Sequence, residues 1–544
     1  MLEKIKKFFS DGHRIRLTAI LCFIVLYLSA QTALQPNNDP VPEKKRVELK
    51  RAGELKTREG FEPQILIDSV VFFHDGAYMH CDSAYLDQKS NSFEAFSNIV
   101  VEQGDTLFLY GDYLYYDGNT KLLMVRNNVR LENKGVTLFT DSLNYDRILN
   151  FGYYFDGGML VDSLNELTSY WGQYEPGIKI ATFSDSVKLV NNKFTLYSDT
   201  LKYNTTTKIA TILGPSVIIS DSGYIETRKG WYNTQTEESL LLDQSLVTSK
   251  DGTKTLTGDS ISYHRASGYG EVFGNMVVTD TLQKMILHGH YGYYNELTGY
   301  AMATDSAWCV DYSQGDSLYL HADTLKMITD SIFKQVKAYY GVRFYRSDFQ
   351  GVCDSMQFNS RDSILYLYKD PILWNESYQL TGDTIEIFMN DSTIDHIHMK
   401  KYCFAIEDKD SVHFNQLKGR DLKAFFKDKQ IHHILVEGNA ESIFYPEEND
   451  KTMIGLNRTE SGFLSIGLKN KKIDKLKIWP KPKGKITPLA DLVPDEMKLE
   501  QFRLFDYIRP LDKDDIFRKI KIRNDQIIKR INVPDNLFDQ GGDY

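Results

Sequence analysis

The chain has 544 residues and a net charge of −10, and 13% of its residues are aromatic, including 34 Tyr and 30 Phe. The negative charge argues against a nucleic-acid-binding protein, which depends on a basic surface. The excess of tyrosine is typical of β-structure with partly hydrated edges, and the apolar content of 42% is enough for a continuous core.

The first 30 residues predict export. Lys4, Lys6 and Lys7 precede an apolar run from Leu17 to Ala30. A basic segment followed by a short apolar run is typical of a secretory signal peptide, although the same run could remain as an N-terminal anchor. Residues 31–62 are polar and contain three prolines, so we expect a flexible linker there.

The stretch Thr106–Glu132 contains the unit from which most of the chain is built. An alternating segment from Leu107 to Tyr116 is followed by the polar turn Asp117-Gly118-Asn119-Thr120 and by a second apolar segment, Leu122–Leu131. Alternation predicts half-buried strands, and Asp-Gly-Asn is typical of a hairpin turn. The unit therefore predicts two antiparallel strands.

This unit recurs at a nearly constant spacing. An aspartate or its replacement marks the register, and successive marks are 29 to 33 residues apart, at positions 82, 112, 141, 170, 199, 228, 259, 290, 323, 354 and 383. Such a period is typical of stacked repeats whose units bury apolar faces against their neighbours. A second mark, as in Asn127-Asn128-Val129 and Gly274-Asn275-Met276, predicts a tight corner.

We therefore expect an all-β fold, an elongated β-jelly-roll or solenoid of stacked antiparallel strands with a repeat of roughly 30 residues. The stacked repeats should occupy residues 63–404. Residues 405–469 are strand-rich but irregular, and should form terminal rungs or a cap that protects the sheet edge. Residues 470–544 are expected to be a C-terminal extension that is partly helical or mobile.

The sequence offers no catalytic or metal site. It has no Gly-rich phosphate loop, GxSxG or HExxH motif, and none of the five cysteines has a metal-binding spacing. The recurring aspartates could resemble the carboxylates of polysaccharide-cleaving β-helices. Their presence in most repeats instead favours a structural role, in which they satisfy backbone donors at a strand start or corner. We expect no enzyme activity and no cofactor.

Pairs of Leu or Ile and Tyr residues form the candidate binding site. The members of a pair are two residues apart and so share one face of a strand. Stacking would align them into a long apolar stripe, which comprises Leu114, Tyr116, Leu143, Tyr145, Leu201, Tyr203, Ile261 and Tyr263. The stripe could simply fill the core, or it could line a groove for acyl chains if the sheets do not close fully.

The repeat resembles the OstA/LptA-type proteins of lipopolysaccharide export. The resemblance is carried by Gly-Asp-Tyr-Leu-Tyr-Tyr-Asp at 111–117, Thr-Asp-Ser-Leu-Asn-Tyr-Asp at 140–146 and Gly-Asn-Met-Val at 274–277, within a region of roughly residues 63–445. The extra rungs and the C-terminal extension make the chain similar to the long OstA-like form of Bacteroidota-type bacteria.

This resemblance implies a periplasmic β-jelly-roll that carries lipopolysaccharide, or bridges its path, in outer-membrane biogenesis. It also implies lipopolysaccharide or a related glycolipid as the ligand, other export components as partners, and end-to-end β-augmentation between molecules. Two alternatives remain open, a β-helix that binds or cleaves polysaccharide and a structural periplasmic scaffold. A full-length cleft would favour the carrier, and an acidic cluster on one outer face would favour the enzyme.

Overall fold

The computed structural model describes residues 45–519 except 296, 314–315, 330–333, 391–393, 429, 449–451 and 470–471. The expected signal peptide or anchor, residues 1–30, lies outside the described residues. In the part of the chain that is described, no helix is long and apolar enough to cross a membrane. Contacts divide the chain into two units. Unit one holds the residues up to Asp105 together with Tyr113–Leu123, and unit two holds Thr106–Asp112 and the residues from Met124 onward.

Unit one is built of antiparallel strands around the long strand β3, which pairs with β4, as β4 does with β5. Its strands are β1 (Glu48–Arg51), β2 (Glu54–Arg58), β3 (Phe61–His74), β4 (Ala77–Asp87) and β5 (Ser92–Gln103), with parts of β6 (Leu107–Asp117) and β7 (Leu122–Asn133). The linker expected over residues 31–62 is wrong for its second half, where β1 and β2 lie. Charged residues conceal these strands, because each pairs with β3 and leaves most of its side chains in solvent.

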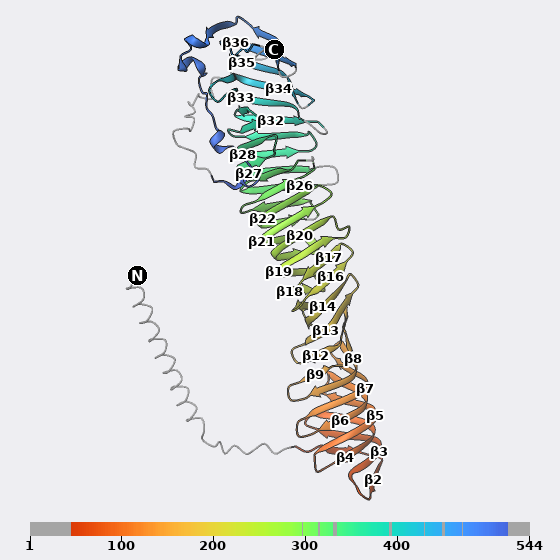
Figure 1. Ribbon diagram of the computed structural model, residues 1–544. Coiled ribbons are helices and arrows are strands. Elements are labelled where there is room, and N and C mark those ends of the chain that lie inside the picture. Colours follow the sequence, from red (N-terminus) through yellow and green to blue (C-terminus); the bar gives the residue numbers. More distant parts are fainter. Residues whose placement is uncertain are drawn as a thin grey trace, which may run out of the picture. The chain divides into compact units, whose positions relative to one another are not determined.

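Unit two continues the stack with strands that lie one above another as rungs (Figure 1). Its first strands are β8 (Val136–Asp146), β9 (Phe151–Tyr154), β10 (Gly158–Val161), β11 (Asn165–Ser169), β12 (Trp171–Glu175), β13 (Ile180–Asn191), β14 (Phe194–Asn204), β15 (Ile209–Ile212), β16 (Ser216–Ser220), β17 (Gly223–Thr227), β18 (Lys229–Asn233), β19 (Glu238–Ser249), β20 (Lys254–His264), β21 (Tyr269–Asp280), β22 (Met285–Asn295), β23 (Tyr300–Thr304), β24 (Trp308–Asp311) and β25 (Leu318–His321).

The later strands are β26 (Thr324–Thr329), β27 (Lys334–Tyr345), β28 (Gln350–Asn359), β29 (Ile364–Tyr368), β30 (Ile372–Asn375), β31 (Tyr378–Thr381), β32 (Thr384–Met389), β33 (Ile394–Asp408), β34 (Phe414–Lys427), β35 (Gln430–Phe444), β36 (Gly455–Lys469), β37 (Lys472–Trp479) and β38 (Lys483–Pro488). Short 3-10 turns occur at Arg265–Ser267, Leu489–Asp491, Pro494–Met497, Asp506–Ile508 and Asp515–Phe517. The register pairs these strands antiparallel, as in β13 with β14 and β33 with β34. The expected all-β antiparallel fold is confirmed, and the parallel rungs of a β-helix are excluded for the described pairings.

Each long strand bends in its middle and contributes one half to each of two facing sheets, here called wall one and wall two. In β13, Asp185 and Ser186 have positive φ, and the register shifts there between Ser184 and Val187. Wall one then holds Ile180–Ser184, and wall two holds Val187–Asn191. The Asn and Gly corners expected from the sequence occur at such bends, since these residues tolerate positive φ, as at Asn127, Asn128 and Gly274.

The recurring aspartates lie beside these corners. The side-chain amide of Asn128 donates to the Asp112 carboxylate at 2.6 Å, and Asn275 donates to Asp259 at 2.9 Å in a later rung. The expected structural role at a corner is therefore found, but the donor is a side-chain amide of the next strand rather than a backbone N–H. The bond joins adjacent strands where the ladder between them is interrupted by the bulge.

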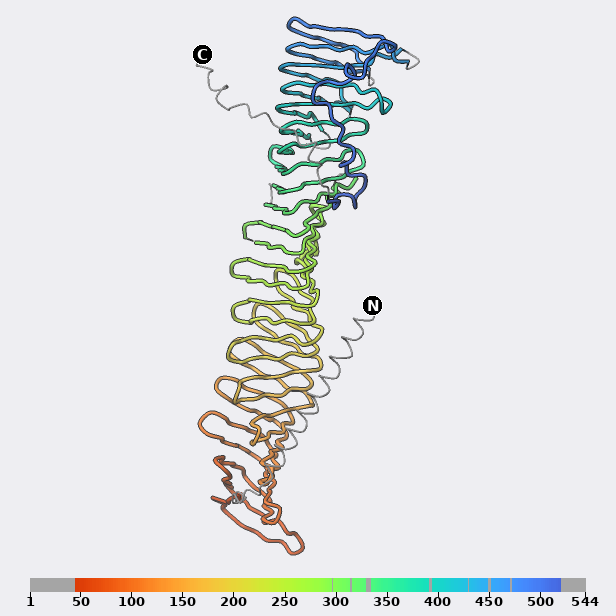
Figure 2. The backbone as a smooth tube through the Cα atoms, turned by 90° about the vertical axis from the view of Figure 1, so that its left-hand side faces the viewer, coloured from red at the N-terminus to blue at the C-terminus, as the bar shows by residue number. Residues whose placement is uncertain are grey.

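The C-terminal part of the chain differs from the cap and the partly helical tail expected from the sequence. Residues 405–469 form regular rungs, β33 to β36, and β37 and β38 complete the stack. The segment 489–519, here called the strap, then runs back beside the rungs (Figure 2). Its described residues hold short 3-10 turns and no α-helix, and residues 520–544 lie outside the described part.

Three buried glutamines of wall two hold the strap. The Gln416 amide donates to the Met497 carbonyl and accepts from the Leu499 N–H, both at 2.8 Å. Gln379 repeats this arrangement one step down the stack, donating to the Arg503 carbonyl at 2.9 Å and accepting from the Phe505 N–H at 2.8 Å. In a third step the Arg509 guanidinium donates to Gln350. Register places the first two glutamines opposite Ile406, on the outer face of wall two.

Candidate functional site

The residues expected to form the apolar stripe lie in wall one and point toward wall two. Seven of the eight are buried, namely Leu114, Tyr116, Leu143, Tyr145, Leu201, Tyr203 and Ile261. Tyr263 is partly buried. The first pair, Leu114 and Tyr116, belongs to unit one, and the other three pairs belong to unit two. The i, i+2 spacing therefore identified the inward face of these strands.

In unit two, strand register aligns the tyrosines into one continuous row, here called the Tyr row. Large and small residues alternate along it from strand to strand: Tyr145, Gly152, Tyr174, Ala181, Tyr203, Ala210, Tyr232, Ser239, Tyr263, Gly270, Tyr294 and Ala301. The same row continues with aliphatic residues and ends with Ile434, Ile466 and Leu476. An inward-facing row thus passes from rung to rung through the unit.

The small residues of the row make room for the neighbouring tyrosine rings. A Cβ atom added at Gly152 would lie 2.9 Å from Cδ2 of Tyr145 and 3.3 Å from Cδ1 of Leu143. Both distances are shorter than ordinary carbon contacts. The interior of these rungs is therefore filled by the chain's own side chains, and an acyl chain requires the walls to move apart.

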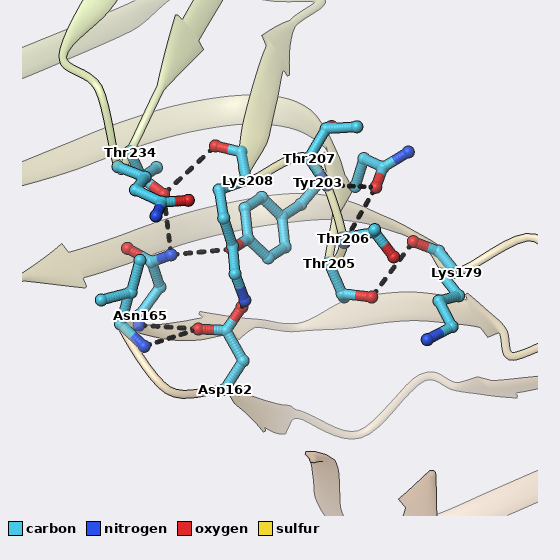
Figure 3. A network of polar contacts seen from close by, with 12 residues as sticks. Asp162, Asn165, Lys179, Tyr203, Thr205, Thr206, Thr207, Lys208 and Thr234 are labelled. Carbon is cyan, nitrogen blue, oxygen red and sulfur yellow. Dashed lines mark hydrogen bonds and ion pairs between the residues drawn. The ribbon is translucent and has the colours of Figure 1, made fainter. Parts of the chain in front are cut away.

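Opposite the corner, the free ends of the two walls meet in a seam that polar side chains close (Figure 3). The Tyr203 hydroxyl of wall one donates to the Asp162 carboxylate at 2.6 Å and accepts from the Asn165 amide at 2.7 Å. Asn165 also donates to Thr234 at 2.9 Å, and Lys208 pairs with Asp162 at 2.7 Å. These bonds tie wall one to the start of β11 in wall two.

Burial and hydrogen bonding oppose each other at Asp162. Burial disfavours its charged form, but hydrogen bonds from Lys208 and Tyr203 outweigh this effect and hold the pKa of the carboxyl below its ordinary value. Burial, followed by the neighbouring Asp162, raises the pKa of Tyr203. Tyr203 therefore remains a neutral hydroxyl that donates to a carboxylate, which is the stronger, charge-assisted kind of hydrogen bond.

Other seam contacts follow the same plan in other rungs. In unit one the Tyr116 hydroxyl lies 2.6 Å from Nδ1 of the buried His74. In unit two Tyr174 donates to Asn133 at 3.3 Å, and Asn191 donates to Asn165 at 2.8 Å. Sequence reasoning missed these partners. The available signal was an Asn at the end of the second strand of the unit, as in Leu131-Glu132-Asn133 and Leu189-Val190-Asn191.

The Tyr row becomes more accessible toward the C-terminal rungs. Tyr203 is fully buried, Tyr232 is 6% exposed and Tyr294 is 37% exposed. Beyond Tyr294 the row is apolar, with Met327 and Phe358 at the equivalent positions. These side chains have no hydroxyl with which to close the seam, so the polar closure belongs to the earlier rungs.

Two hollows lie on the outer side of wall two rather than between the walls. One measures about 1020 Å³ and is bordered by Lys188, Tyr197 and Arg228, and the other measures about 630 Å³ and is bordered by Arg130 and Phe139. Both are bordered by polar and charged side chains as well as apolar ones. They are distinct from the apolar stripe.

Metal and cysteine chemistry adds no further candidate. Among the described residues, no group of three His, Cys, Asp or Glu side chains could hold a metal ion. His288 stacks on Trp308 with ring centroids 3.8 Å apart, and burial lowers the pKa of its imidazole. Cys81, Cys309, Cys353 and Cys403 are buried free thiols, and burial raises the pKa of Cys309 to about 12.

Comparison with known proteins identifies a family over part of the chain. Residues 44–199 match the model of the family described as OstA-like protein, which confirms the predicted resemblance over these residues. The crystal structure of LptH, the LptA-homologous periplasmic component of the lipopolysaccharide transport device from Pseudomonas aeruginosa, matches 26% of this chain and 95% of that chain, with 12% identity and a TM-score of 0.21. A likeness at that score carries no weight for function. No curated protein matches the chain.

Proposed function

We propose that this chain, which carries an OstA-like domain over residues 44–199, is a periplasmic carrier or bridge for lipopolysaccharide or a related glycolipid in outer-membrane biogenesis. It acts without catalysis. Acyl chains lie between the two walls against the Tyr row, and the charged sugar and phosphate groups remain in water at the seam. Other export components join it through a free strand edge, such as that of β2, by β-augmentation.

The observation that carries this proposal is the unbroken course of the Tyr row from Tyr145 to Leu476. Apolar burial contributes about 25 cal/mol per Å² and needs no directional contact. An acyl chain held in this way exchanges one set of side chains for the next at little cost. A row that continues from rung to rung therefore supports movement of a lipid along the stack.

The packed interior requires that the walls open for a lipid to enter. At the corner the two walls are joined by continuous backbone, whereas at the seam they are joined by side-chain hydrogen bonds such as those of Tyr203. Water can replace a side-chain hydrogen bond at a net cost of about 1 kcal/mol. The seam is therefore the side that opens, and the corner acts as the hinge.

Photo-crosslinking in cells tests the proposal. A photo-reactive amino acid at Tyr145 should attach to glycolipid, whereas the same group at the exposed Lys202 should not. Lys202 is the matched control because it lies on the opposite face of β14, between Leu201 and Tyr203. Equal glycolipid attachment at both positions, or none at Tyr145, would contradict the carrier function.

A paired substitution separates the carrier from a structural scaffold. Leu201→Asp places an unpaired charge between the walls and should reduce delivery of glycolipid to the outer membrane, whereas Lys202→Asp should not. The comparison uses variants with the same unfolding midpoint as the wild type. Wild-type delivery by a folded Leu201→Asp variant would favour the scaffold, and attachment of carbohydrate without acyl chains at Tyr145 would favour a polysaccharide binder.

A further inference from the structure

The last rung of the stack carries a concentrated positive charge. Residues 469–485 contain eight lysines and one acidic residue, Asp474, in a chain whose net charge is −10. The lysines that the structure describes here are exposed. Among them Lys485 alone has an ion-pair partner, Glu496, at 2.7 Å. The remaining positive charges of this rung are available to an anionic partner.

Apolar side chains are exposed on the same rung. Leu476 is the end of the Tyr row and is 49% exposed, and Ile486 is 68% exposed. Trp479 stacks on Phe463 with ring centroids 5.4 Å apart, yet 41% of it remains exposed. In the inner rungs a neighbouring strand covers such positions, but within the described residues β37 and β38 pair with β36 alone.

Register separates the two kinds of side chain. Leu476 pairs with Ile466 and therefore faces the interior side, whereas Lys475 and Lys477 point to the outer face of wall one. On β38, Ile486 pairs with Asn457 on the interior side, and its neighbour Lys485 pairs with Arg458 on the outer side. The rung thus presents an apolar centre with lysines on both outer faces.

The composition of this edge disfavours another β-strand as the partner. Lysines at an edge, together with Pro480 and Pro482 between β37 and β38, oppose pairing with a further strand. Exposed aliphatic residues and a tryptophan within a rim of lysines instead match the interface of a bilayer with anionic lipids. There the apolar groups enter the headgroup region and the lysines meet phosphates.

We propose that the rung formed by β37 and β38 docks on a bilayer surface that contains anionic phospholipid. Lys475, Lys477 and Lys483 contact the lipid phosphates, while Leu476 and Ile486 enter the headgroup layer. This docking does not depend on passage of a lipid between the walls. A failure of crosslinking at Tyr145 leaves it intact, and the reverse also holds.

A local reporter tests the docking in the full chain. A fluorophore is attached to Gly484→Cys in a Cys22→Ser background, since the four described cysteines are buried. The site accepts a side chain, because the nearest atoms to an added Cβ lie at 3.8 Å. Vesicles of phosphatidylcholine mixed with phosphatidylglycerol should shift its emission, and phosphatidylcholine alone should not. The same label at Lys202→Cys should respond to neither.

Charge reversal supplies the second arm. Lys475→Glu, Lys477→Glu and Lys483→Glu together should raise the lipid concentration for half-maximal response at least tenfold, roughly the effect of removing several surface charges. Reversal of the exposed Lys202, Lys229 and Lys250 should leave it unchanged. High salt should suppress the wild-type response, which needs no variant to fold. An equal response to neutral vesicles, or an unchanged response in the first triple variant, would overturn the proposal.

Discussion

The Asn165 side-chain amide donates a hydrogen bond to the Tyr203 hydroxyl at 2.7 Å, across the seam between wall two and wall one. The two residues are 38 positions apart in the sequence. Their bond belongs to a buried network that includes Asp162, Lys208 and Thr234. Because the walls have no backbone connection on this side, such bonds decide how firmly the interior is closed.

Loss of the Tyr203 hydroxyl should loosen the seam. Tyr203→Phe leaves the ring in place but removes a donor to Asp162 and an acceptor from Asn165, at a cost of about 1–3 kcal/mol. Hydrogen exchange at residues 201–204 should accelerate. Tyr197→Phe is the control, because Tyr197 is 45% exposed on the outer face of wall two. Equal exchange in the two variants would show that the hydroxyl does not hold the seam.

Acidification should weaken the same network. The pKa of Asp162 is lowered in the folded protein. Its contribution is therefore fully present above the unfolded value of about 3.9 and is lost as pH falls through the folded value. Urea unfolding from pH 7 to pH 3 should show the wild type losing its advantage over Asp162→Asn below about pH 4. A constant difference between them over this range would refute the assignment, and Asp221→Asn should match the wild type throughout.

A methylated side chain at Gly152 should not fit the closed interior. Gly152→Val places new atoms against Tyr145 and Leu143, and overpacking of this kind costs about 1–3 kcal/mol. A lower unfolding midpoint is expected. Gly484→Ala, at which the nearest atoms lie 3.8 Å from the added Cβ, should leave the midpoint unchanged. A stable Gly152→Val variant would mean that the walls stand further apart in solution.

The strap should detach when a buried glutamine is removed. Gln379→Ala leaves the Arg503 carbonyl and the Phe505 N–H without their side-chain partner, at about 1–3 kcal/mol for buried groups. Limited proteolysis of the full chain should then cut within residues 499–519 faster than in the wild type. The exposed Gln283→Ala provides the matched control. Unchanged cleavage would show that apolar contacts of the strap are sufficient.

The corner bond should contribute modestly to stability. Asn128→Gly keeps the positive φ but removes the donor to Asp112, so we expect a loss of about 0.5–1.5 kcal/mol in the free energy of unfolding. Asp112→Ala should cost a similar amount. The double variant should cost little more than either single change, because both remove the same bond. Full additivity in this double-mutant cycle would contradict a direct interaction.

The sequence alone determined the repeat, its antiparallel pairing and the inward face of its strands. The spacing of the aspartate marks follows the rung length, and the i, i+2 parity of Leu201 and Tyr203 follows the pleat of a strand, so both are local properties that a sequence records directly. The same locality misled at residues 48–58. There, charged residues pair with a single strand and show no apolar alternation.

Only the tertiary structure decided what covers each face. Gln350, Gln379 and Gln416 have the composition of an outer surface, and they are buried because residues more than 80 positions later in the chain cross over them. Parity likewise placed Tyr203 inward but could not pair its hydroxyl with Asn165, since stacking brings them together across the seam. Strand periodicity fixes the direction of a side chain, whereas its partner depends on how distant rungs and the strap meet in space.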